Sequence, residues 1–137
     1  MLDFKTLLTV NFIVNMINML TMAVLWGRYG RKFQGLSLWF ANMAMHVAGV
    51  GLILLRGALP APVAIVAGNT LLMSSTLFLL AGMERFTGMR GRPWGNAPAF
   101  SLYVLALAYF TVVRDDIAAR TMAGSALIVF VDAQTCW

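Results

Sequence analysis

Residues 54–72 read LLRGALPAPVAIVAGNTLL, an aliphatic stretch interrupted by an arginine, two prolines and a Gly-Asn pair. Gly57 can end a helix that comes before it, and Pro60 and Pro62 prevent that helix from continuing. Arg56 then lies at the end of the first helix, where its side chain can reach lipid headgroups. The stretch therefore predicts a tight turn between two apolar helices.

The composition on both sides of this turn is that of a membrane protein. Of the 137 residues, 61% are hydrophobic and 11% are charged, whereas soluble domains carry about a quarter charged residues. A bilayer core of about 30 Å needs roughly 20 helical residues, and charge-free apolar segments of about this length predict helices at 6–27, 36–55, 63–83, 97–113 and 121–137. The first three have full spanning length, the fourth is short and the fifth is cut off. We predict an all-α integral membrane bundle of four to five transmembrane helices, one polytopic domain over 1–137 without a soluble domain.

Basic residues gather in two of the connections between these segments. The sequences RYGRKFQ and ERFTGMRGRPWGNAP carry most of them, whereas RGALPAP has one arginine and RDDIAAR balances two arginines against two aspartates. By the positive-inside rule the two basic connections are cytoplasmic, which places the N-terminus outside. The opening MLDFKTLL is expected to begin an uncleaved first helix, because no small-residue cleavage pattern closes its long apolar run.

These connections also account for the formal net charge of +5. Insertion topology and anionic lipids explain basic loops in a membrane protein, so lipids and not nucleic acid are the predicted partners. The expected location is a membrane that the chain crosses several times. The residues expected to set the topology or to contact headgroups are Arg28, Arg31, Lys32, Arg56, Arg85, Arg90 and Arg92.

Asparagines inside the apolar segments are the first candidates for a site. Asn11, Asn15 and Asn18 follow helical spacing and form one stripe together with Met22. The stripe either makes hydrogen bonds between helices, worth about 0.6 kcal/mol each, or forms the wall of a polar ligand cavity in the outer half of the bundle. Asn69 lies about two turns into the third segment, where its amide needs a partner on another helix.

A histidine is the second kind of candidate. His46 lies one helical turn after Asn42 in the second segment. It is either a satisfied packing residue, or a proton-responsive group, or a ligand to a metal, haem or a chlorophyll-type pigment. One histidine without a second ligand identifies no cofactor, so the cofactor is left open. The nearby methionines favour apolar packing over Cu(I) binding, and no metal site is predicted.

Other features bear on packing. Two pairs of small residues have a spacing that permits close helix approach, either within the bundle or in a homodimer seam: Ala44 with Ala48, and Ala64 with Gly68. Asp132 and Gln134 fall in the middle of the fifth segment, where Asp132 should be partnered, neutral or close to an interface. Cys136 is the only cysteine, so no intrachain disulfide is possible.

Several short motifs follow one another along the chain. They are the D-x-x-T-L-L of residues 3–8 with Asn11 after it, the G-L-x-x-W of residues 35–39, then LLRGALP, VAIVAGNTLL and LLAGMERFTG. In this order they resemble the N-terminal multi-spanning membrane region that precedes many bacterial GGDEF-type diguanylate cyclases, where an L-R-G-x-L-P hairpin, a G-N or A-N in the next helix and a G-x-R-R-F-x-G exit recur. The resemblance covers nearly the whole chain, and Glu84 stands where the family usually has a first arginine.

The resemblance implies a sensory or input module of a bacterial cyclic di-GMP signalling protein, located in the bacterial cytoplasmic (inner) membrane. The sequence contains no GGDEF motif, no phosphate-binding loop, no carboxylate cluster for metal and no nucleophile-base arrangement, so we expect no enzymatic activity. This hypothesis predicts a longer native polypeptide and a polar outer cavity around Asn11 and Asn69.

The alternative is a small accessory or structural subunit of a larger multi-subunit membrane complex, packing against partner helices and lipids or pigments. It predicts a broad apolar face, which can include His46, that meets other membrane protein subunits. A homodimer is the other expected assembly.

Overall fold

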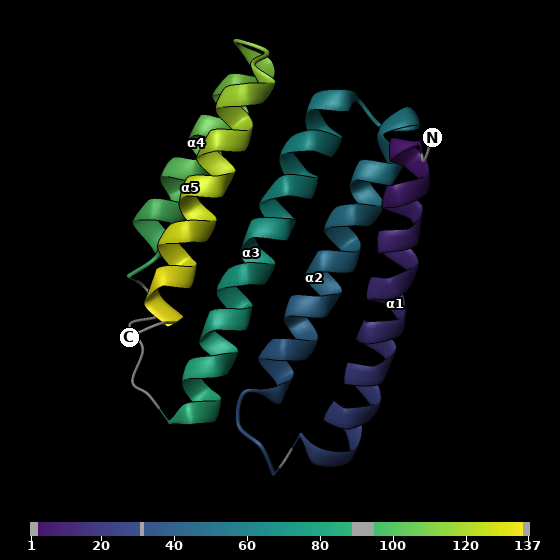
Figure 1. The fold of residues 1–137 in the computed structure, drawn as a ribbon, viewed down its shortest axis with the longest axis vertical. Coiled ribbons are helices and arrows are strands. Elements are labelled where there is room, and N and C mark those ends of the chain that lie inside the picture. Colours follow the sequence, from purple (N-terminus) through teal and green to yellow (C-terminus); the bar gives the residue numbers. More distant parts are fainter. Residues whose placement is uncertain (1–2, 31, 89–94, 136–137) are drawn as a thin grey trace.

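The computed structural model describes residues 3–30, 32–88 and 95–135 (Figure 1). Within these ranges the chain is helical and contains no strand. The elements are α1 Phe4–Tyr29, α2 Leu36–Leu54, the short 3-10 helix η1 Leu55–Gly57, α3 Ala61–Thr87, α4 Ala97–Val112 and α5 Ile117–Thr135. Arg31, Arg90, Arg92 and Cys136 lie outside the described residues.

The helices alternate in direction, and Figure 1 shows α1, α2 and α3 side by side with the α4–α5 pair beyond α3. Three segments are long and apolar enough to cross a membrane, namely Lys5–Tyr29, Leu36–Gly57 and Ala61–Thr87, while α4 is apolar but shorter. For the described residues, the prediction of an all-helical fold with three full-length apolar helices is confirmed. We call the end of the bundle that holds η1 and the α4–α5 connection, residues 113–116, the hairpin end; α1 begins there and α5 runs away from it.

The turn between α2 and α3 forms as its residues predict. The last residues of α2 continue into η1, which ends at Gly57, and Pro60 occupies the N-cap position of α3. Pro62 fits the first turn of α3, where a missing backbone N–H costs nothing. At the opposite end of the bundle Gly35 (φ 98°) precedes α2 and Gly88 (φ 73°) follows α3, both in the left-handed conformation that glycine adopts without strain.

The fifth helix begins four residues earlier than its charge-free segment indicates. It starts at Ile117 instead of residue 121, because the Asp116 carboxylate accepts a hydrogen bond from the Ala119 backbone N–H (3.0 Å) and caps the first turn. Arg120 is therefore a helical residue. The other helices also differ from the predicted bounds by up to four residues, since α1 and α3 include charged residues at their ends where a charge-free segment stops.

Asp116→Ala should lower the free energy of unfolding by about 1 kcal/mol, because it leaves an N–H group of the first turn of α5 without a partner. Thermal unfolding of the purified protein in detergent measures the loss. Asp3→Ala is the matched control, since Asp3 occupies the N-cap position of α1 but makes no capping hydrogen bond. Equal effects of the two substitutions would contradict the assigned start of α5.

The α2–α3 pair is the closest helix contact of the fold. Small or short polar residues recur every seventh position on both helices, and the antiparallel register brings Gly49 to Gly68 and Gly35 to Gly82. A Cβ atom on Gly49 would lie 2.9 Å from the Gly68 carbonyl oxygen, so the two backbones touch without side chains between them. The same spacing places Asn42 level with Ser75 between these contacts. All six residues of this small-residue seam are buried: Gly35, Asn42, Gly49, Gly68, Ser75 and Gly82.

The α4–α5 pair packs against the other face of α3. The buried cluster of this region consists of Leu80, Tyr103, Leu107, Leu127 and Val131. Near the end of α5, Gln134 Nε2 donates a hydrogen bond to Asn96 Oδ1 (2.8 Å) just before α4 begins, which joins the two helices far from the hairpin end. Gln134 is thus exposed near the end of α5 and not in the middle of an apolar span.

Candidate functional site

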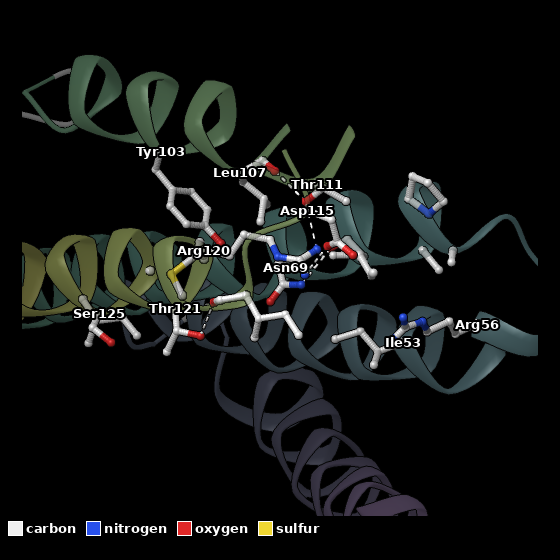
Figure 2. Close-up of a pocket in the computed structure, with 18 residues that line it drawn as sticks. Ile53, Arg56, Asn69, Tyr103, Leu107, Thr111, Asp115, Arg120, Thr121 and Ser125 are labelled. Atoms are coloured by element: carbon white, nitrogen blue, oxygen red, sulfur yellow. Dashed lines mark hydrogen bonds and ion pairs between the residues drawn. The ribbon is translucent and has the colours of Figure 1, made fainter. Parts of the chain in front are cut away.

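A cavity of about 620 Å³ lies at the hairpin end between α3 and the α4–α5 pair (Figure 2). Its volume is in the range of small-molecule sites, about 300–1,000 Å³. The end of α2 and η1 close one side of it. The residues with polar side chains on its wall are Arg56, Asn69, Tyr103, Thr111, Asp115, Arg120, Thr121 and Ser125.

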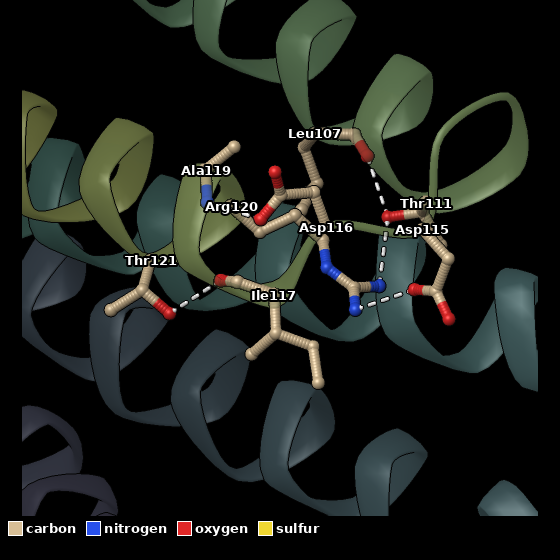
Figure 3. Close-up of polar contacts among 8 residues, drawn as sticks. All are labelled: Leu107, Thr111, Asp115, Asp116, Ile117, Ala119, Arg120 and Thr121. Carbon is tan, nitrogen blue, oxygen red and sulfur yellow. Dashed lines mark hydrogen bonds and ion pairs between the residues drawn. The ribbon is translucent and has the colours of Figure 1, made fainter.

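Arg120 is the best-connected polar residue of the cavity (Figure 3). Its Nη2 atom lies 2.8 Å from Asp115 Oδ1, and its Nη1 atom donates a longer hydrogen bond (3.4 Å) to Thr111 Oγ1. Thr111 in turn donates to the Leu107 carbonyl oxygen (2.6 Å). The Arg120 side chain is only 13% exposed, whereas that of Asp115 is 79% exposed. A mostly buried guanidinium is therefore neutralised by a carboxylate on the surface.

The position of Arg120 in its helix explains why it needs this partner. Arg120 lies in the first turn of α5, where the helix dipole disfavours a positive charge. Asp115 and Asp116 precede the helix, and Asp116 is committed to the cap, so Asp115 is the carboxylate left to pair with the guanidinium. The local sequence thus positions one cation at the cavity wall and one replaceable anion beside it.

The rest of the wall is largely apolar, with Ile53, Ile65, Met73, Leu107 and Ile128 contributing to it. Two of its polar groups are satisfied within their own helices. Asn69 Nδ2 donates to the Ile65 carbonyl oxygen (2.8 Å), and the Thr121 hydroxyl donates to the Ile117 carbonyl oxygen (2.9 Å). The cavity therefore has a charged end near η1 and the α4–α5 connection and a mostly apolar interior.

The structure brings two of the sequence-predicted site residues together. Arg56 and Asn69, the two residues singled out in the LLRGALP and VAIVAGNTLL motifs, both line the cavity. Asn11 does not, because α1 packs on α2 and lies away from α4 and α5. The expectation of one cavity around Asn11 and Asn69 is corrected: the residues lie on separate parts of the bundle.

The asparagine stripe of α1 is exposed or half-buried. Asn15 Nδ2 donates to the Asn11 carbonyl oxygen (2.8 Å) and to Asn11 Oδ1 (3.1 Å), so these two amides bond along their own helix. Asn18, one turn further on, is also exposed.

The polar residues of α2 lie elsewhere. Asn42 is 6% exposed in the small-residue seam, and His46, one turn later, is half-buried on the same helix. Neither lines the cavity. Within the described residues no group of three or more His, Cys, Asp or Glu side chains is placed to hold a metal ion.

Two of the motifs near the other end of the bundle have a packing explanation. The Trp39 indole lies directly over Gly82, where a Cβ atom would collide with the ring. Trp39 also packs on Phe86 with ring centroids 5.3 Å apart, and Phe33 packs on Phe86 at 6.3 Å. The G-L-x-x-W and GMERFTG motifs therefore meet: Gly82 permits the approach of the Trp39 ring, and Gly35 permits the approach of the Gly82 carbonyl oxygen.

The sequence patterns do not predict four residues of the cavity wall: Arg120, Asp115, Thr111 and Tyr103. The signal was present in RDDIAAR, whose balanced charges indicated only a connection poor in positive charge. In the structure two of these charges, Asp115 and Arg120, form an ion pair at the cavity. If Asp116 is treated as the N-cap, helical spacing places Arg120 in the first turn of α5. The charge-free segment begins only after Arg120 and therefore leaves it outside the predicted helix.

The positive-inside rule predicts that Arg56 and Arg85 lie on opposite sides of the membrane. In the structure these two arginines lie at opposite ends of the bundle. Arg28, Lys32 and Arg85 are exposed at the end away from the cavity, and Arg56 is exposed at the hairpin end.

Comparison with protein-family models, with curated proteins and with solved structures finds no match for this chain.

Proposed function

We propose that the chain is a non-catalytic integral membrane module, resembling the sensory or input region of a bacterial cyclic di-GMP signalling protein, and that its stimulus is a ligand of the cavity described above. The observation that carries this proposal is the mostly buried Arg120 guanidinium at the wall of a cavity of ligand size. The convergence of Arg56 and Asn69 on the same cavity adds to it, because these residues belong to the motifs on which the resemblance rests.

The proposed orientation places the hairpin end outside the cytoplasm. All five helices cross the inner membrane, α4 with a short span, and the N-terminus is outside. The exposed Arg28, Lys32 and Arg85 at the other end agree with the positive-inside rule. In this orientation the cavity faces the periplasm or the outer leaflet, and α5 delivers its end to the cytoplasm.

The proposed route of the signal is α5. A change of partner at Arg120 acts on the first turn of α5, and the helix extends over 19 residues to the opposite end, about 28 Å away. The Gln134–Asn96 hydrogen bond ties the far end of α5 to the start of α4, so the two helices move together. The α2–α3 pair provides the fixed reference, because its backbones touch along the small-residue seam.

The proposal is tested in cells that express the protein from its own gene. Asn69→Leu, which changes the cavity wall, should alter the cellular level of cyclic di-GMP, whereas Asn11→Leu on the exposed face of α1 should leave it at the wild-type value. Immunoblots of membranes would establish that both variants accumulate equally. Unchanged cyclic di-GMP in Asn69→Leu and in a strain without the protein would overturn the signalling function.

A second candidate function is that of an accessory subunit in a larger membrane complex. The observation that favours it is α1, which among the described helices packs on α2 alone and exposes apolar residues together with Asn11 and Asn18. Isolation in mild detergent followed by intact-mass analysis separates the two functions. A polypeptide that contains this chain and a cyclase domain supports the sensory module, and a mass near 15.0 kDa with stoichiometric companions supports the subunit.

A further inference from the structure

We infer that the cavity binds a single-chain amphiphile with an anionic head, and that this head takes the place of Asp115 on the Arg120 guanidinium. The inference deepens the proposed function and rests on its assignment of the cavity as a ligand site. The shared chemistry is a carboxylate or phosphate attached to one acyl chain, as in a fatty acid or an anionic lysophospholipid.

The charges at the hairpin end favour an anionic head. Arg56 and Arg120 both line the cavity, and Asp115 is the acidic side chain among its lining residues. Among the described residues Arg56 makes no ion pair, and Asp115 is the one ion-pair partner of Arg120. One guanidinium at the cavity therefore lacks a counterion, and a second anion there would complete the charge balance.

The unequal exposure of the ion pair identifies Asp115 as the replaceable member. Its side chain is 79% exposed, and the residue belongs to the connection between α4 and α5, not to a helix. Water can therefore solvate its carboxylate when the pair opens. The Arg120 side chain, at 13% exposed, lacks that alternative and needs an anion beside it. An incoming head group can take the guanidinium with two hydrogen bonds, since arginine presents five donors in a planar fork.

The interior of the cavity favours an acyl chain behind the head. From Arg120 the wall continues along α5 to Ile128, about 12 Å further on. Met73 and Leu107 face the same space from α3 and α4. The amide of Asn69 and the hydroxyl of Thr121 donate to carbonyl oxygens of their own helices, so these two groups can lie beside an acyl chain without an unpaired donor. A charged end joined to an apolar interior matches an amphiphile better than a fully polar anion.

The test is isothermal titration calorimetry on the full chain in nanodiscs of zwitterionic lipid. Three probes carry the same tail: palmitate, palmitoyl-lysophosphatidylglycerol and uncharged monopalmitoylglycerol. We expect both anionic probes, or the one whose head fits, to bind about 10- to 100-fold more tightly than the neutral probe. Which of the two binds distinguishes a free fatty acid from a lipid source. Equal binding of monopalmitoylglycerol would overturn the inference.

Substitutions locate the head group. Arg120→Gln should lower the affinity for the anionic probe about 10- to 100-fold. Arg114→Gln should leave this affinity unchanged, because Arg114 is exposed on the same connection but does not line the cavity. Asp115→Asn should strengthen binding about 2- to 5-fold, because it removes the internal competitor. Because Asp115→Asn should change the affinity in the opposite direction to Arg120→Gln, it still tests the inference if Arg120→Gln does not fold. Weaker binding to Asp115→Asn would contradict the replacement of Asp115 by the head.

The two proposals fail separately. If the anionic probe binds as expected but cyclic di-GMP is unchanged both in Asn69→Leu and in a strain without the protein, the ligand class stands and the signalling function falls. If cyclic di-GMP responds to Asn69→Leu but the neutral probe binds as tightly as the anionic ones, the signalling function stands and the ligand class falls.

Discussion

Gly49→Val should lower the free energy of unfolding by about 3 kcal/mol, at the upper end of the usual cost of overpacking. The reason is that the first added carbon would lie 2.9 Å from the Gly68 carbonyl oxygen and 3.0 Å from Leu72 Cγ. A flexible side chain could move aside, but a backbone carbonyl in the middle of a helix cannot move without moving α3. Thermal unfolding in detergent, followed by circular dichroism, measures the loss.

Gly57→Val is the control for this prediction. No atom lies within 4 Å of a Cβ atom built on Gly57, and its φ is not positive, so we expect a change within about 0.5 kcal/mol. A Gly49→Val protein as stable as the wild type would mean that α2 and α3 do not meet at this point.

Leu107→Ala should cost about 2 kcal/mol, the second large effect that the fold predicts. Leu107 is 2% exposed in the cluster that joins α4 and α5 to α3. Core Leu→Ala substitutions in soluble proteins cost about 2–5 kcal/mol. The lower value is expected here because lipid and detergent tails solvate leucine as well as a protein interior does, which leaves lost packing as the main term. Chemical unfolding in mixed micelles gives the value.

Leu105→Ala is the matched control, since Leu105 is the same residue type on the same helix and is 68% exposed. Its replacement should change stability by less than about 0.5 kcal/mol. If Leu105→Ala cost as much as Leu107→Ala, the face that α4 turns toward α3 and α5 would have to be reassigned.

The helices of this chain follow from its sequence more directly than the site does. Long apolar runs predict α1, α2 and α3, and Gly57, Pro60 and Pro62 predict the turn between two of them, because both signals are local. The position of Asn69 on a cavity wall and of Asn11 on an outer face depends on which helices are neighbours. Helical spacing alone contains no information on that choice.

Arg120 shows why the centre of the site escaped prediction. A charge in an otherwise apolar segment counts against a membrane helix, so the charge-free segment begins after Arg120. The cost is removed in the structure by Asp115, five residues earlier, and by Thr111 on the preceding helix. Asp115 is a local partner, but Thr111 reaches Arg120 only because α4 and α5 fold back on each other, which is a tertiary event.

The glycines of the small-residue seam have a regular spacing in the sequence. Glycines at positions 35, 49, 68 and 82 are separated by 14, 19 and 14 residues, so the arrangement reads the same from either end. The outer intervals are two seven-residue periods each, and the middle interval is the length of chain needed to reverse direction through η1 and the two prolines. A distant relative could change nearly every lipid-facing residue and still keep this palindromic spacing, which makes it a search pattern for chains whose overall similarity has been lost.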